Sequence, residues 1–387
     1  MVSPSSLYLH IPFCRIKCTY CAFNTYVNLD NLIEPFVQAI IEEIRIVGSS
    51  KPRQQLHTVY IGGGTPSLLT AEQLQRILVA IQSEFDLLPG SEISMESNPS
   101  DLTSDYMTSV RAVGVNRMSI GMQSANESEL KLFERRHDLD AVIRAVEAAR
   151  KGGFDNLNLD LIYGIPQQTL ANWENSLKVL LQLQPEHVSL YALGLEDGTP
   201  LKTWVETGKY PAPDDDLAAD MYDLATDMLG GAGLAQYEIS NWATPGLECK
   251  HNLQYWRNLP YPGVGPGAHG YADGVRYSTI LSPQRYIKVM KEADSDFVYP
   301  RTPATDQAVV VDRDSEIAET LIMGLRLTQE GIDRETFRQR FGEDLLAVHP
   351  ETIARYQKHG LLYVDDAVVR ITTKGRLLSN MVFRDLV

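Results

Sequence analysis

Short apolar runs alternate with amphipathic stretches through the first half of the chain. The runs are rich in β-branched and aromatic residues, as is typical of buried parallel strands, and they cover 7–11, 58–61, 92–96, 117–121, 157–162 and 187–191. The stretches between them have helical periodicity and cover about 31–47, 70–84, 103–113, 138–151 and 169–182. Thr70 with Gln73 predicts a capping box, and Thr169 predicts an N-cap.

This alternation predicts parallel strands, in either a barrel or a doubly wound sheet. The ends of the strands favour the barrel, because a barrel gathers the carboxyl ends of its strands around one mouth, where active sites lie. Polar or Gly-rich groups lie at or near the carboxyl ends of the predicted strands: the cysteine segment 14–21, the turn 62–66, Glu96 with Asn98, Gln123, Asp160 and Tyr191. The six predicted strands, each part of a strand–helix unit, therefore predict an α/β fold with a partial (β/α)6 TIM-like barrel that is open at one side.

The pattern changes in the second half of the chain. Residues 196–245 contain one predicted helix, at 215–229, and 248–278 are dense in Gly, Pro, Tyr and His. Three predicted helices (314–327, 333–341 and 350–358) then precede two short strands (361–364 and 368–372), an order that predicts a small winged-helix-like domain. We therefore expect a barrel over 1–240, a connecting segment over 241–310 and a C-terminal domain over 311–387.

Composition and charge narrow the function classes. The chain has 387 residues, 44% of them hydrophobic, and its formal net charge of −15 is spread without a long acidic or basic block. Such a surface argues against nucleic acid as a partner, so the C-terminal domain is predicted to be a lid or docking module. Neither a secretory signal nor a run of about 18–20 apolar residues is visible, which predicts a cytoplasmic protein. Attachment to a membrane surface stays open.

The candidate chemistry begins with the cysteines. The chain has four, and Cys14, Cys18 and Cys21 lie within eight residues. Thiolates hold iron–sulfur clusters, and three protein ligands leave one iron of a 4Fe–4S cubane open for S-adenosylmethionine (SAM). The alternative is a zinc site with His10 as a fourth ligand.

Several separate motifs resemble the HemN/HemW group of radical SAM proteins: His-Ile-Pro-Phe-Cys at 10–14, the cysteine triplet, the Gly-rich turn 62–66, and the segments 121–124 and 160–166. The resemblance covers nearly the whole chain and implies a cluster held by the three cysteines. It also implies SAM contacts at Tyr8, Tyr20, Gly63, Gly64, Thr65, Glu96, Gln123, Arg135 and Asp160. From their position alone, the last four could equally be solvated loop residues or salt-bridge partners.

Three features separate the branches of this group. Phe23 stands where the oxidase branch has a fourth cysteine, and the chain starts six residues before its first predicted strand, whereas the oxidases have a long N-terminal extension. Residues 251–256 match the His-Asn-x-x-Tyr-Trp motif of the HemW branch. The chain therefore resembles the haem chaperones, which implies haem as a ligand, a haem-acceptor protein such as a respiratory enzyme, and no catalytic residues. Dimerisation stays open.

Two enzyme alternatives remain, both related to porphyrin biosynthesis. One is an oxygen-independent coproporphyrinogen III oxidase, a radical SAM decarboxylase, and the other is a different radical SAM enzyme that acts on a tetrapyrrole.

The candidate haem ligand is His251, because histidine is a frequent axial ligand of haem iron and the motif's aromatic residues could pack on a porphyrin. The alternative is a hydrogen-bonded histidine that fixes a loop. Cys249 is predicted to be a spare thiol, with haem attachment as its alternative, and His269 is a second candidate for a haem or pocket residue.

Overall fold

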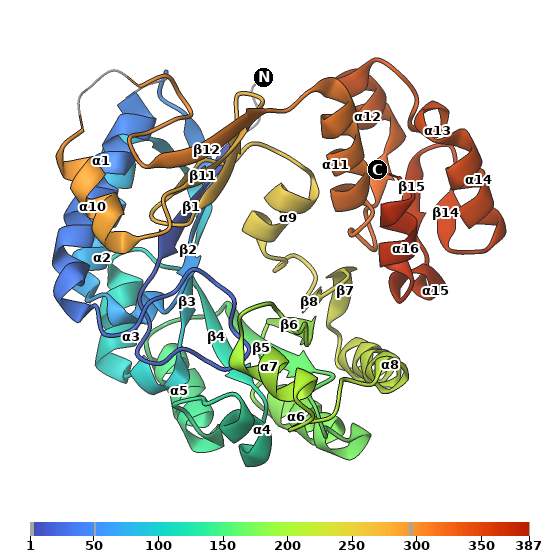
Figure 1. Ribbon diagram of the computed structural model, residues 1–387, viewed down its shortest axis with the longest axis horizontal. Helices are drawn as coiled ribbons and strands as arrows, with labels where there is room; N and C mark the ends of the chain where they lie inside the picture. The colour runs from blue at the N-terminus through green and yellow to red at the C-terminus, as the bar shows by residue number, and fades with distance from the viewer. Residues whose placement is uncertain (1–3, 50–51, 294–296, 387) are drawn as a thin grey trace.

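The computed structural model describes residues 4–49, 52–293 and 297–386. Its largest sheet has nine strands in the order β7-β8-β6-β5-β4-β3-β2-β1-β9. Six consecutive strands pair in parallel: β1 (Ser5–Ile11), β2 (Gln55–Gly63), β3 (Asp86–Ser97), β4 (Arg117–Gln123), β5 (Leu157–Tyr163) and β6 (His187–Ala192). With helices along their outer side (Figure 1), these strands confirm the predicted partial (β/α)6 barrel.

The helices between the strands follow the sequence pattern. They are α1 (Ile33–Ser49), α2 (Ala71–Glu84), α3 (Ser104–Ala112), α5 (Leu139–Lys151) and α6 (Leu170–Gln182). The capping box of Thr70 with Gln73 and the N-cap at Thr169 are both confirmed. The short helix α4 (Glu127–Leu132) was not predicted, because six residues are too few to display a helical period.

Apolar and polar side chains alternate along the strands, so the outer face of the barrel sheet differs from its inner face. In β4, Met118 and Ile120 pack in the main hydrophobic core, whereas Arg117 and Ser119 line a cavity inside the barrel. Asp160 of β5 lines the same cavity. Since side chains alternate along a strand, the apolar set packs against the helices and the other set points inward. The interior of this barrel is therefore polar.

The strand ends differ from the prediction in detail. β4 extends two residues past its predicted run, so Gln123 lies within the strand and not after it. Glu96, Asp160 and Tyr191 lie within β3, β5 and β6, as they do within the predicted runs. Polar residues at these positions are compatible with a strand because they face the interior cavity rather than the core.

Short strands extend both edges of the barrel sheet. At one edge β9 (Gly263–Val264) pairs with β1, and at the other β8 (Asn241–Ala243) pairs with β6 and with β7 (Ala235–Glu238). None of the three was predicted. The β7–β8 hairpin spans residue 240, which was predicted as a domain boundary.

The connecting region carries α7 (Pro200–Glu206), α8 (Asp215–Gly231), α9 (Lys250–Trp256) and α10 (Pro283–Lys291). A second sheet, β10 (His269–Ala272), β11 (Val275–Thr279) and β12 (Thr305–Val310), is antiparallel. Within the described ranges, no helix combines the length and the apolar character needed to cross a bilayer.

The C-terminal part confirms the predicted order of helices followed by a hairpin. It contains α11 (Arg313–Gly324), α12 (Arg334–Phe341), α13 (Leu345–Val348), α14 (Pro350–Lys358), α15 (Thr373–Arg376) and α16 (Ser379–Arg384). The hairpin strands β14 (Leu362–Val364) and β15 (Val368–Ile371) are joined by β13 (Ile332–Asp333), which was not predicted. These elements have a hydrophobic core of their own.

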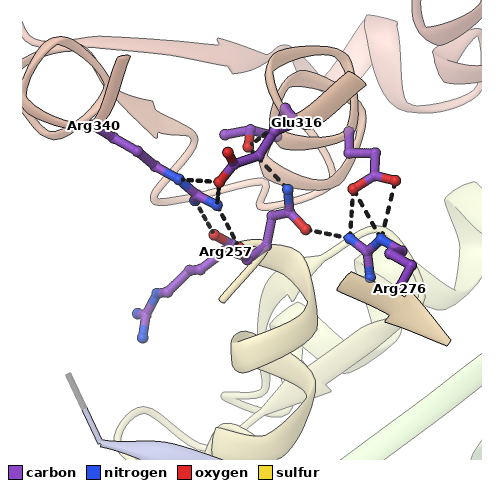
Figure 2. A network of polar contacts seen from close by, with 7 residues as sticks. Arg257, Arg276, Glu316 and Arg340 are labelled. Carbon is purple, nitrogen blue, oxygen red and sulfur yellow. Dashed lines mark hydrogen bonds and ion pairs between the residues drawn. The ribbon is translucent and has the colours of Figure 1, made fainter. Parts of the chain in front are cut away.

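A polar network joins this part to the segment that follows α9, and α9 itself lies between the barrel and the C-terminal helices (Figure 1). Arg340 of α12 binds Glu316 at 2.6 Å and donates to the backbone carbonyl of Asn258 at 2.9 Å (Figure 2). Arg276 donates to the Asn258 side chain at 2.6 Å and pairs with Glu319 of α11. Asn258 therefore accepts hydrogen bonds from Arg340 through its backbone carbonyl and from Arg276 through its side chain.

Candidate functional site

The inward-facing strand residues and the cysteine loop enclose a cavity of about 660 Å³. It brings together the three cysteines and all but one of the predicted SAM contacts: Tyr20, Gly63, Gly64, Thr65, Glu96, Gln123, Arg135 and Asp160. The exception is Tyr8, which lines a second, neighbouring cavity. Residues more than 140 positions apart in the sequence thus meet at one site.

Backbone hydrogen bonds fix the cysteine loop after β1. The Cys14 N–H donates to the carbonyl of Tyr26 at 2.9 Å, and the Tyr26 N–H donates to that of Pro12 at 2.7 Å. Further along, the Thr19 hydroxyl donates to the carbonyl of Leu132 at 2.7 Å. The Cys21 N–H donates to the Cys18 carbonyl at 3.1 Å, which closes a turn between the last two thiols. The loop is therefore anchored on both sides of its cysteines.

His10 is not available as a metal ligand in this arrangement. Its Nε2 lies 2.9 Å from the backbone carbonyl of Asn24, which can only accept, so Nε2 carries the proton. Its Nδ1 then accepts from the Tyr8 hydroxyl at 3.0 Å. Across the described residues, no group of three or more His, Cys, Asp or Glu side chains is placed to hold a single metal ion. The geometry argues against the zinc alternative.

The surroundings of the thiols fit a cluster. Arg135 Nη1 lies 3.4 Å from Cys18 Sγ, and the Thr65 hydroxyl lies 3.4 Å from Cys14 Sγ, so two donors reach the sulfurs. Burial raises the pKa of the Cys14 and Cys21 thiols, which disfavours their thiolates unless positive charge is supplied. An iron–sulfur cluster supplies that charge when it binds.

The Gly-rich turn packs directly on the cysteine loop. A Cβ at Gly64 would lie 2.6 Å from the backbone oxygen of Phe13 and 3.1 Å from Cys14 Sγ. Gly63 has a φ of 108°, and a Cβ there would lie 2.7 Å from the His10 ring. Contacts within the protein thus require glycine at both positions. Both glycines also line the first cavity, and their predicted close approach to a ligand stays a prediction.

Two half-buried carboxyl groups, those of Glu96 and Asp160, face the cavity. Glu96 accepts from the Tyr60 hydroxyl at 2.9 Å and from the Gly63 N–H at 3.0 Å, and burial raises its pKa to about 7. Asp160 accepts from Ser119 at 3.2 Å and from Asn158 at 2.7 Å, and burial raises its pKa as well. Such carboxylates can accept hydrogen bonds from a ligand's ammonium or hydroxyl groups.

Sequence reasoning missed Arg117, a buried cation on the cavity wall. It is 2% exposed, and its Nε has no hydrogen-bond partner among the described residues. An incompletely paired buried guanidinium favours an anionic or acceptor group nearby. The alternation of polar and apolar residues in β4 could have revealed Arg117 as a cavity residue, because it places Arg117 on the same face as Ser119 and Gln123.

His251 lies outside both cavities and is fully buried. Its Nδ1 bonds the Thr58 hydroxyl at 2.7 Å, its Nε2 bonds the Tyr255 hydroxyl at 2.8 Å, and burial lowers its pKa to about 3. A neutral ring with both nitrogens engaged presents none to haem iron. The geometry corresponds to the loop-fixing alternative.

The other two candidate haem ligands, Cys249 and His269, differ in their exposure to solvent. Cys249 is fully buried, lies 3.4 Å from Glu92 and has its pKa raised by burial to about 12, as expected of an unreactive thiol. His269 is exposed and lines the second cavity.

Comparisons with known proteins agree with this geometry. Residues 8–180 match the Radical SAM superfamily and residues 311–378 match the HemN C-terminal domain. The chain is 37% identical over 380 residues to the heme chaperone HemW of Lactococcus lactis, which covers 98% of this chain and 96% of that protein. It is 35% identical over 381 residues to the heme chaperone HemW of Bacillus subtilis, with 98% of each covered.

The fold is similar to that of the coproporphyrinogen III oxidase HemN from Escherichia coli. The TM-score is 0.84 at 24% identity, and the match covers 99% of this chain and 90% of that one.

Proposed function

Because this chain belongs to the HemW family of radical SAM proteins, we propose that it is a haem chaperone, which binds haem and a SAM-ligating 4Fe–4S cluster and transfers haem to an acceptor protein. The observation that carries the proposal is the identity of 35–37% over nearly the full length to proteins named heme chaperone HemW. The identity to the oxidase HemN is lower, at 24%. The acceptor and the cytoplasmic location stay predictions.

The residues of the first cavity support the cofactor assignment. Cys14, Cys18 and Cys21 would hold the cluster, which when bound offers one iron without a protein ligand for SAM and its one-electron reduction. Glu96 and Asp160 would accept from the amino or hydroxyl groups of SAM. Arg135 and Arg117 would offer positive charge to its carboxylate.

We expect SAM to bind more tightly as the pH rises from about 6 to about 8. Burial raises the pKa of Glu96 to about 7, so its carboxyl is mostly protonated at the lower pH and mostly an acceptor at the higher one. If only the carboxylate form binds, the apparent affinity increases roughly tenfold across this interval. Isothermal titration of the cluster-loaded protein at several pH values measures the slope.

The control for this experiment is Glu96→Gln, which keeps the size of the side chain and removes its titration. Subtracting its pH profile also removes the ionisation of SAM itself. Equal slopes for the wild type and the variant would contradict the role of Glu96.

Haem binding tests the proposed function directly. We expect the anaerobically purified, cluster-loaded protein to take up about one haem per chain with a shift of the Soret band. The same sample, given SAM and a reductant, should leave coproporphyrinogen III unconverted. Production of protoporphyrinogen IX, or the absence of any haem uptake, would contradict the proposal.

A further inference from the structure

A second cavity, of about 420 Å³, lies next to the first and shares Ala22 and Phe23 with it. Its other walls are Tyr8 and His10 of β1, Asn24 of the cysteine loop, Tyr255 of α9, Tyr261, Gly267, His269 and Leu281. Its volume lies within the range of about 300–1,000 Å³ that ligand pockets commonly have. The cysteine loop thus forms a wall of both cavities.

Two of the side chains that line this second cavity are apolar and exposed to solvent. Phe23 is 68% exposed and Leu281 is 57% exposed, and both line it. Tyr255 and Tyr261 lie edge to face at 4.5 Å between ring centroids and add aromatic surface. Exposed apolar side chains next to aromatic rings are typical of a binding site for a flat, apolar ligand.

Asn24 holds the walls of the cavity together. Its side-chain amide donates to the backbone carbonyl of Pro266 at 2.9 Å and to that of Leu281 at 3.0 Å. A Cβ at Gly267, whose φ is 85°, would lie 2.3 Å from Asn24 Nδ2, so the turn before His269 fits closely on this amide. The cysteine loop and the segment that carries His269 are therefore fixed to each other.

His269 is the one histidine of this cavity whose ring makes no hydrogen bond to another described residue. The ring of His10 is engaged on both nitrogens by Tyr8 and Asn24. His269 is exposed at the start of β10, where the pairing of its backbone with Ser278 of β11 fixes its position. Its imidazole can reach an iron ion without breaking a hydrogen bond.

We propose that this second cavity is the haem site and that His269 supplies an axial ligand to the haem iron, while Phe23 and Leu281 pack against the macrocycle. The inference rests on the proposed function, because it assumes that the protein carries haem. It assigns ligation to His269 instead of His251, whose ring is buried with both nitrogens engaged. It also gives Phe23 a role, since an apolar ring suits this wall better than a polar side chain.

The test is a titration of the anaerobic, cluster-loaded full-length protein with ferric haem, followed at the Soret band. We expect His269→Ala to weaken haem binding by about tenfold or more, the loss that corresponds to roughly 1.4 kcal/mol. The matched control is His359→Ala, which removes an exposed histidine from the C-terminal end of α14 and should bind haem like the wild type.

A second variant separates loss of ligation from loss of folding. His269→Tyr keeps a possible iron ligand of a different kind, so the bound haem should change from a histidine-type to a tyrosinate-type absorption and electron paramagnetic resonance spectrum. Wild-type affinity of His269→Ala together with an unchanged spectrum of His269→Tyr would overturn the inference and leave the proposed function standing. A wild-type protein that takes up no haem would overturn both.

Discussion

Replacing Cys14 with serine is expected to abolish binding of the 4Fe–4S cluster, and with it binding of SAM at the cluster. The three thiols are the only cysteines of the first cavity, and a hydroxyl is a poor substitute for a thiolate on iron. The loop itself should survive, because backbone hydrogen bonds such as that of Cys14 to Tyr26 hold it. Iron and sulfide content and visible absorption after anaerobic reconstitution measure the loss, from about four irons per chain to almost none.

The matched control is Cys249→Ser. This thiol is fully buried beside Glu92, in neither cavity, and its substitution should leave iron content and absorption unchanged. A full cluster spectrum in Cys14→Ser, or a comparable loss in Cys249→Ser, would refute the assignment of the ligands. A sample that contained zinc without iron or sulfide would also end the argument for a radical SAM protein.

The barrel could be predicted because its signals are local and repeated. Each parallel strand carries an apolar run, and each helix that follows carries a helical period or a cap such as Thr70. The edge strands could not be predicted, since β9 has only two residues and β8 only three. Pairing at those edges is decided by neighbouring backbone in space, which a pattern along the chain does not reveal.

The contents of the first cavity follow from topology once the barrel is assumed, because parallel strands bring their carboxyl ends together. This reasoning placed the cysteines, the Gly-rich turn and Glu96 near one another. It did not find Arg117, which lies at the first position of β4, away from the carboxyl end. The alternation of polar and apolar residues in β4 would have found it.

Whether the ring nitrogens of His251 are hydrogen-bonded could not be predicted from the sequence, for a different reason. Its motif is recognisable, but the state of its ring depends on the hydroxyl of Thr58, a residue 193 positions earlier in the chain. A histidine with two occupied nitrogens and one with two free nitrogens look identical in sequence. Only the fold separates His251 from His269.

Glu43 is a second position where a single substitution should have a large effect. It lies on α1, is fully buried, and accepts three hydrogen bonds at 2.7 Å, from the Gly265 N–H and from the hydroxyls of Tyr286 and Thr302. Burial raises its pKa, and these three donors partly offset that shift. One carboxylate thus connects α1 to the turn before β10 and to α10.

Glu43→Ala is expected to destabilise the protein by about 3–5 kcal/mol, because it leaves buried donors without acceptors and opens a cavity. The denaturant midpoint of the full-length holoprotein, followed by tryptophan fluorescence, measures the change. The neighbouring Glu42→Ala is the matched control: Glu42 lies on the same helix, is about half exposed and pairs with Arg45 at 3.3 Å, so its loss should change stability by less than about 1 kcal/mol.

A third variant, Glu43→Gln, distinguishes the role of the acceptors from that of the charge. The amide oxygen can still accept from one or two of the donors, so this variant should be more stable than Glu43→Ala. If Glu43→Ala unfolded at the same denaturant concentration as Glu42→Ala, the carboxylate would not be holding these elements together. The turn that begins at Gly265 and leads to His269 would then be held by its other contacts, among them the Asn24 hydrogen bonds and the pairing of β10 with β11.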